Sequence, residues 1–143
     1  MSAWTTLYNG CHMAGSGGLS CTECDETLFG GDLVKQGNTG NLAASIHQRL
    51  LNLSRQRRLD FNLLLTRYAI ERLLYRLSCS RFQSQFVLKG AMLFVLWEMP
   101  LSRPTRDLDL LGFGNSSAQA LQQRFAEICQ TEVVDDGLQF VPD

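Results

Sequence analysis

Two aspartates, Asp107 and Asp109, are the side chains of this sequence best placed to bind a divalent cation. They alternate with Leu108 and Leu110, which is the pattern of a strand with one apolar face. On such a strand the two carboxylates project from the same face, about 7 Å apart. Carboxylates suit Mg²⁺, and two bound Mg²⁺ ions can promote an in-line phosphoryl displacement. The spacing therefore predicts Asp107 and Asp109 as catalytic metal ligands, with a solvated strand edge as the alternative.

The residues around Gly90 have the pattern of a phosphate site. Gly90 stands between a short apolar strand predicted over Phe86–Leu88 and a buried helix predicted over Met92–Trp97. A glycine at this junction leaves backbone N–H groups open to a triphosphate at the start of the helix. Additional positive charge can come from three nearby side chains: Lys89, Arg103 and Arg106.

Two helices are predicted upstream of these motifs. Asn41 is expected to cap the first, and Asp60 the second, which runs to about Leu77. A basic helix pair can read DNA, but the link Gln56–Leu59 lacks the usual turn glycine. We therefore expect two packing helices with solvated basic faces.

The remaining segments complete an α+β pattern. A strand is predicted over Asp107–Phe113 and an amphipathic helix over Ala118–Cys129. Two short apolar segments then flank Asp135-Asp136-Gly137, which indicates a β-hairpin. A hairpin tip would explain both aspartates without a catalytic role. The expected order is two helices, then strand, helix, strand, helix and hairpin.

Composition limits the function classes. The chain has 143 residues, 45% of them hydrophobic, and a formal net charge of −1, so one domain with its own core is expected. Residues 41–124 carry twelve basic and five acidic side chains, and this part would meet a polyanion. No apolar run approaches the roughly 20 residues of a membrane helix, and no secretory signal is visible. We expect a cytoplasmic protein without membrane contact.

Residues 1–40 are rich in glycine and serine and are expected to form a poorly ordered tail before a folded domain over residues 41–143. The tail contains Cys11, Cys21 and Cys24, which together with His12 could supply four zinc ligands. The side chains of the adjacent Cys11 and His12 diverge, however. Free thiols in a loop are the simpler interpretation.

The segments Phe86–Gly90 and Arg103–Leu110 resemble the AbiEii/AbiGii-type nucleotidyltransferases, toxins of bacterial toxin–antitoxin systems in the DNA polymerase β-like nucleotidyltransferase superfamily. The resemblance covers about residues 41–143. It implies a mixed β-sheet with flanking helices, a nucleoside triphosphate substrate and a two-metal Mg²⁺ site. It also implies a cognate antitoxin protein and, in some members, the 3′ end of tRNA as the acceptor.

The resemblance assigns roles to particular residues. Gly90 would contact phosphate, and Asp107 and Asp109 would bind the metal. The family commonly has a second glycine and then serine or threonine after the first glycine, whereas this chain has Ala91 and Met92. The hydroxyl of Thr105 or of Ser102 is a candidate to replace the missing one.

The resemblance also implies a third carboxylate and a basic residue on later strands, and the sequence ends at Asp143 before them. We therefore expect the N-terminal part of a nucleotidyltransferase domain, inactive by itself. The alternative function is a non-catalytic module that binds nucleic acid or a partner protein on a degenerate nucleotidyltransferase fold.

Overall fold

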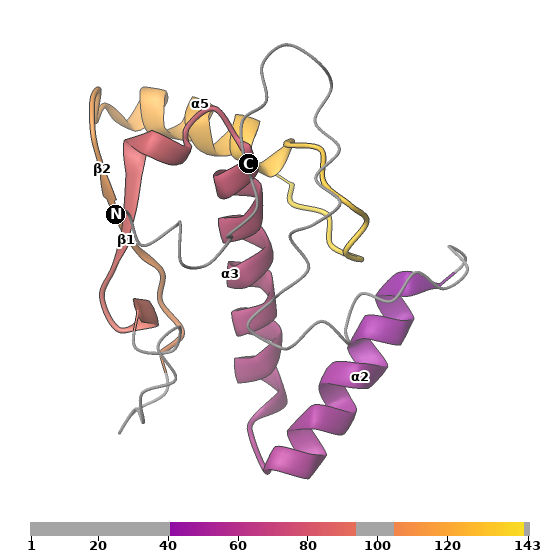
Figure 1. Ribbon diagram of the computed structural model, residues 1–143. Helices are drawn as coiled ribbons and strands as arrows, with labels where there is room; N and C mark the ends of the chain where they lie inside the picture. The colour runs from indigo at the N-terminus through magenta and orange to yellow at the C-terminus, as the bar shows by residue number, and fades with distance from the viewer. Residues whose placement is uncertain (1–40, 94–104, 142–143) are drawn as a thin grey trace.

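Residues 41–93 and 105–141 are described by the computed structural model in Figure 1. Their elements are α2 (Leu42–Arg57), α3 (Phe61–Cys79), the 3₁₀ turn η1 (Gln83–Gln85), β1 (Phe86–Lys89), β2 (Asp109–Gly112) and α5 (Ala118–Cys129). The long helix α3 is central. In Figure 1, α2 lies on one side of it, β1 and β2 lie on the other, and α5 crosses near its C-terminal end. The α+β class predicted from the sequence is confirmed.

Several predictions concern residues outside these ranges. The predicted tail, with Cys11, Cys21 and Cys24, lies outside the described residues, and so do Ser102 and Arg103. The same holds for most of the helix predicted over Met92–Trp97, although its first two residues are helical.

Local capping explains where α3 begins. Asp60 Oδ1 accepts a hydrogen bond of 2.8 Å from Leu63 N, which satisfies a backbone donor of the first turn. Asn41 stands at the N-cap of α2 as predicted, but its side chain makes no capping hydrogen bond. Helix α2 ends at Arg58, whose backbone is left-handed, with φ 52° and ψ 41°. Both predicted upstream helices are therefore present.

Strands β1 and β2 pair antiparallel, with Lys89 opposite Asp109. One face of the pair packs on the core, as the alternation in the sequence predicted. The side chains on this face are Phe86, Leu88, Leu108 and Leu110. The second strand begins at Asp109, later than predicted, so Asp107 precedes the strand instead of lying within it.

Two apolar clusters pack against α3. The first joins its C-terminal half to β1 and α5, through residues that include Leu74, Leu77, Phe86, Leu88 and Ile128. The second joins its N-terminal half to α2 and consists of Ile46, Leu50 and Tyr68. Burial of these side chains supplies the main driving force that holds α2 and the strand pair on α3. Among the described segments, no helix has the length and apolarity to cross a membrane.

The hairpin predicted around Gly137 is not formed. Residues 133–141 contain no strand, and they follow α5 as an irregular segment (Figure 1). Gly137 has a φ of +68°, and a Cβ atom there would lie 3.0 Å from both Ala43 Cα and Ile46 Cδ1. The segment is therefore packed directly against α2. The prediction was wrong because turn-forming residues give the same signal whether their flanks pair or are buried.

Candidate functional site

The pairing of β1 with β2 brings Gly90 into contact with Asp109. Gly90 follows the last residue of β1, which is opposite Asp109 in the ladder. Its φ is +75°, and a Cβ atom at this position would collide with Asp109 Oδ2 and lie 3.1 Å from Asp109 Cβ. The Asp109 carboxylate thus occupies the space that any side chain at position 90 would need. Two separate parts of the predicted site meet here, and glycine is the residue that permits the contact.

Asp107 lies immediately before β2 and is exposed, as is Asp109. Its backbone N–H donates to Thr105 Oγ1 at 3.4 Å, and the Thr105 hydroxyl donates to Asp107 O at 3.3 Å. Within the described ranges neither carboxylate has an ion-pair partner. Both are therefore accessible to a cation.

Arg106 joins this segment to the start of α3. Its Nη2 lies 3.5 Å from Asp60 Oδ1, and both side chains are more than half exposed. Lys89 is exposed opposite Asp109. The structure therefore places Lys89 and Gly90 beside Asp109 and Thr105 beside the backbone of Asp107, whereas the Arg106 side chain extends to Asp60.

Met92 stands where the resembled family carries a hydroxyl. Its side chain is 2% exposed and belongs to the core cluster of β1 and α5. Leu93 N donates to Gly90 O at 3.2 Å, so the chain turns directly after Gly90. A phosphate at this turn would meet backbone groups, because the residue at position 92 faces the interior.

The oxygen ligands at this site suit a hard cation. Asp107 and Asp109 supply carboxylate oxygens, which Mg²⁺ prefers. Among the residues that the structure describes, no three His, Cys, Asp or Glu side chains gather closely enough to hold a metal ion. Mg²⁺ commonly binds through one or two carboxylates together with substrate phosphates. The two aspartates fit that mode of binding.

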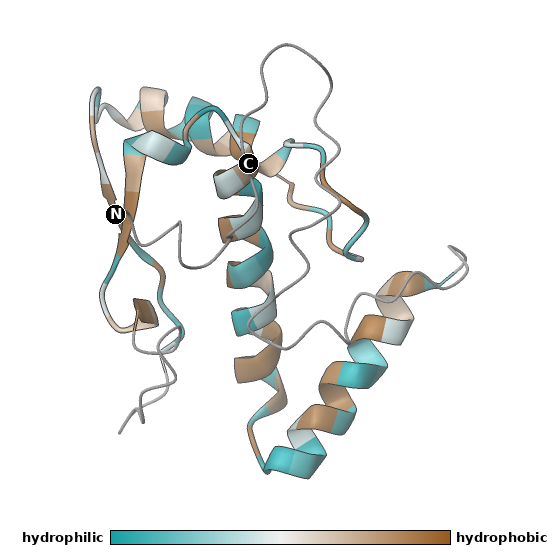
Figure 2. Ribbon diagram, viewed as in Figure 1, coloured by the Kyte–Doolittle hydropathy of each residue, from teal (hydrophilic) through white to brown (hydrophobic). Residues whose placement is uncertain are grey.

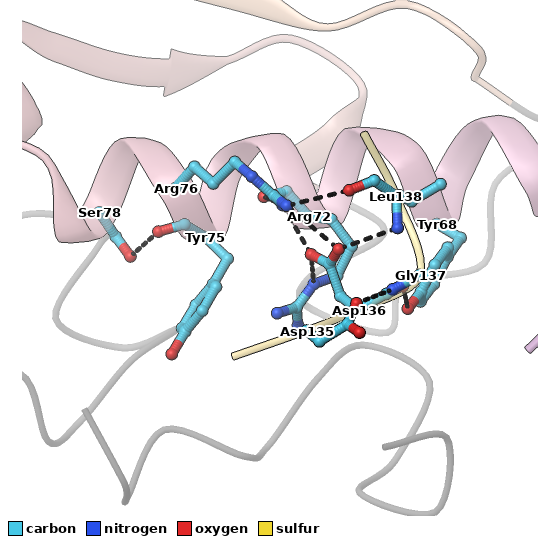
Figure 3. Close-up of polar contacts among 9 residues, drawn as sticks. All are labelled: Tyr68, Arg72, Tyr75, Arg76, Ser78, Asp135, Asp136, Gly137 and Leu138. Carbon is cyan, nitrogen blue, oxygen red and sulfur yellow. Dashed lines mark hydrogen bonds and ion pairs between the residues drawn. The ribbon is translucent and has the colours of Figure 1, made fainter. Parts of the chain in front are cut away.

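Another acidic residue, Asp136, has a different role from the one its sequence context suggested. It is 1% exposed, not at a hairpin tip. Its Oδ2 accepts from Arg72 Nε at 2.8 Å and from Arg76 Nη1 at 2.6 Å (Figure 3). Its Oδ1 accepts from Arg76 Nη2 and Leu138 N, each at 3.1 Å. Tyr68 Oη also donates to Asp136 O at 2.9 Å, so this aspartate joins the C-terminal segment to α3.

The pKa values of this cluster follow from its burial. Burial raises the pKa of the Asp136 carboxyl, but the hydrogen bonds and charges of Arg76 and Arg72 lower it by more, so the net pKa lies below its usual range. Burial raises the pKa of Tyr68 to about 12. Tyr68, Arg72 and Arg76 recur every four residues on α3, which is the sequence signal for a polar stripe. That signal does not reveal which distant acid pairs with the stripe.

An open cavity of about 480 Å³ lies beside this cluster, between the end of α5 and the segment that follows it. Its lining includes Arg76, Cys129, Asp136 and Phe140. The Arg76 guanidinium stacks 4.8 Å from the centre of the Phe140 ring and is bound to Asp136. The charges of Arg76 and Asp136 on this wall are thus already paired with each other, whereas Asp109 has no ion-pair partner among the described residues.

Comparison with protein families gives one match. Residues 72–143, just over half of the chain, match the family model described as "Nucleotidyl transferase AbiEii toxin, Type IV TA system". The matched range starts within α3 and contains both the Gly90–Asp109 contact and Asp136. Neither a curated protein nor a solved structure matches this chain.

Proposed function

The chain belongs to the AbiEii family of nucleotidyl transferase toxins of type IV toxin–antitoxin systems, and on that premise we propose that it transfers a nucleotide from a nucleoside triphosphate to an acceptor hydroxyl. The contact of the Asp109 carboxylate with Gly90 carries this proposal. It supports Asp109 as the metal ligand beside the backbone position that we propose for a phosphate. Lys89 is exposed opposite Asp109 in the ladder, and the exposed Asp107 lies two residues before Asp109.

In the proposed reaction the acceptor hydroxyl oxygen forms a bond to the α-phosphorus of the triphosphate. The bond from that phosphorus to the oxygen that leads to the β-phosphate breaks, pyrophosphate leaves with the electron pair, and the hydroxyl proton passes to solvent. The acceptor that we propose is RNA, with the 3′ end of tRNA as the first substrate to test.

Each side chain of the site has a proposed task. Asp107 and Asp109 hold Mg²⁺, which when bound neutralises negative charge on the transferred phosphoryl group and on the leaving pyrophosphate. Because Gly90 has no side chain, the Asp109 carboxylate lies against the backbone there, beside the backbone groups that we propose to contact the triphosphate. Positive charge comes from Lys89, Arg103 and Arg106. The ion pair of Arg106 with Asp60 is exposed, so it costs little to exchange for a phosphate.

Thr105 has a supporting task in this proposal. Its hydroxyl exchanges hydrogen bonds with the backbone of Asp107, which fixes the turn that leads into β2. The same hydroxyl can instead donate its proton to a phosphate oxygen. It would then replace the hydroxyl that Met92 lacks.

The toxin assignment extends the proposal to partners. We propose that the protein works in the cytoplasm and that a cognate antitoxin protein opposes its action. Because the resemblance implies a third carboxylate beside these two, we expect little transfer by residues 1–143 in isolation. The assay is therefore run on residues 1–143 and on any longer protein that the gene encodes.

The test measures incorporation of each of four α-³²P-labelled nucleoside triphosphates into total RNA and purified tRNA, with Mg²⁺ and with EDTA. We expect labelling that requires Mg²⁺ and falls at least 100-fold in Asp107→Asn and Asp109→Asn. Glu132→Gln is the matched control, because it neutralises an exposed acid outside the site.

Retained labelling in either aspartate variant would show that the site is assigned wrongly. Absence of labelling by the longest encoded protein, with RNA binding indifferent to Mg²⁺ and to Asp107, would favour the non-catalytic module. The burial of Met92 in place of a hydroxyl is the observation that supports that second function.

A further inference from the structure

The turn between α2 and α3 gathers three arginines: Arg55, Arg57 and Arg58. All three side chains are exposed, and none forms an ion pair with another described residue. The whole of α2 contains no acidic side chain. In Figure 2 the end of α2 that turns into α3 is hydrophilic. We refer to these three arginines as the basic corner.

Arg58 occupies a backbone position that favours glycine. Its left-handed conformation turns the chain out of α2, and the N–H of the next residue, Leu59, donates back to Ser54 O at 3.0 Å. Glycine or asparagine usually takes this position, since other side chains are strained there. Arg58 is the one non-glycine residue with positive φ in the described ranges. An arginine kept at a strained position is a reason to look for a role of its side chain in binding.

The surface next to the basic corner is polar. Gln48 Nε2 donates to Asn52 Oδ1 at 3.0 Å on the exposed side of α2, and Gln56 lies one turn beyond Asn52. Arginine, asparagine and glutamine side chains are common phosphate ligands in nucleic-acid complexes. The core of a protein–protein interface is rich in aromatic and apolar side chains as well as arginine, and no large exposed apolar side chain of the described ranges lies on α2. The surface therefore fits a phosphate backbone better than a protein partner.

The basic corner also lies next to the candidate catalytic segment. Asp60 comes two residues after Arg58 and pairs with Arg106 at 3.5 Å. Arg106 in turn precedes Asp107 directly. A polyanion bound at the corner would therefore reach the aspartates past the exposed Arg106–Asp60 ion pair, from which Arg106 can turn to a phosphate at little cost.

We propose that the basic corner binds the phosphate backbone of an RNA and holds the strand beside Asp107, as the acceptor-binding surface of the enzyme. The identity of this RNA as the acceptor rests on the proposed function. Basic residues in the last turn also stabilise a helix through its dipole, so binding and stability must be measured separately.

Binding is measured by the fluorescence anisotropy of a fluorescein-labelled 20-nucleotide single-stranded RNA, in EDTA and without nucleotide, over a series of KCl concentrations. We expect the triple variant Arg55→Gln, Arg57→Gln, Arg58→Gln to raise Kd at least tenfold. The slope of log K against log salt should fall in magnitude by about 2, because each lost phosphate contact removes roughly 0.7.

Arg58→Gly separates binding from folding. Glycine relieves the left-handed backbone, so Tm should stay the same or rise, while RNA binding weakens severalfold. The matched control is Arg81→Gln, which removes one arginine charge at the other end of α3, where Arg81 pairs with Glu127. We expect this control to bind RNA as the parent does.

A triple variant that binds RNA within twofold of the parent overturns the inference, and so does equal weakening by Arg81→Gln. If the triple variant loses binding of poly-glutamate but keeps RNA, the surface takes an acidic protein and the inference is again wrong. If the rate of nucleotide transfer depends on RNA concentration in the triple variant as it does in the parent, the inference is wrong and the proposed function stands. If both aspartate variants still transfer nucleotide, while RNA binding still depends on the three arginines of the basic corner, the proposed function is wrong and the inference stands.

Discussion

Asp136 and the Asp107–Asp109 pair place the same side-chain type in opposite surroundings. Asp136 is 1% exposed and its two oxygens accept hydrogen bonds from two arginines. Asp107 and Asp109 are exposed, and in the described ranges they have no ion-pair partner. Removing a charge from water is costly, so the buried aspartate is stable only with its arginines in place. The exposed pair keeps its full capacity to bind a cation.

This contrast separates folding from chemistry within one small chain. The Asp136 cluster ties the segment after α5 to α3, and Gly137 and Leu138 extend the contact to α2. The Gly90–Asp109 contact depends on the strand pair on the other side of α3 (Figure 1). Substitutions in the first region should change stability, and those in the second should change activity.

Asp136→Ala should have the largest effect on stability. It leaves Arg72 and Arg76 buried without their shared carboxylate, and breaking such a cluster costs about 3–5 kcal/mol. Urea unfolding followed by circular dichroism measures the change. Glu132→Ala, an exposed acid in the same segment, should stay within about 0.5 kcal/mol of the parent. A loss below about 1 kcal/mol for Asp136→Ala would contradict the structural role of the cluster.

Tyr68 should make stability fall in alkaline solution. Burial raises its pKa from 10.0 to about 12, so between these pH values the unfolded chain loses the phenol proton and the folded chain keeps it. Stability from this group is complete below pH 10 and declines by about 2 kcal/mol as the pH rises toward 12. The free energy of unfolding of the parent is compared with that of Tyr68→Phe across this range. Parallel curves would show that Tyr68 does not titrate differently on folding.

Gly90→Ala should combine a modest loss of stability with a large loss of activity. The positive φ costs about 1–2 kcal/mol for a residue with a side chain. The new methyl group must displace the Asp109 carboxylate, so nucleotide transfer should fall at least as far as in Asp109→Asn. Gly114→Ala, also at positive φ but with Arg124 Nη2 as its nearest contact at 3.6 Å, is the backbone control. Full activity in Gly90→Ala would exclude the proposed phosphate position.

Asp107→Asn and Asp109→Asn should have the smallest effect on stability. Both side chains are exposed and unpaired among the described residues, so the free energy of unfolding should stay within about 0.5 kcal/mol of the parent. Thermal unfolding by circular dichroism measures this. Destabilisation above about 1 kcal/mol would give these aspartates a structural role and remove the contrast with Asp136.

The sequence by itself determined the local elements and the chemical motifs. The start of α3 follows from its Asp60 cap, and the extents of α2 and α5 follow from apolar periodicity, which depends on neighbours within a few positions. The leucines beside Asp109 likewise predicted a strand with one buried face. The family match covers residues 72–143, a range that includes the glycine and aspartate segments.

Only the tertiary structure decided which distant groups meet. Three examples are the burial of Asp136 against α3, the contact of Asp109 with Gly90, and the pairing of Arg106 with Asp60. Turn residues at 135–137 carried no information on whether their flanks would pair with each other or pack on α2. Such contacts are fixed by the packing of whole helices and strands, and no local pattern of residues encodes a partner sixty positions away.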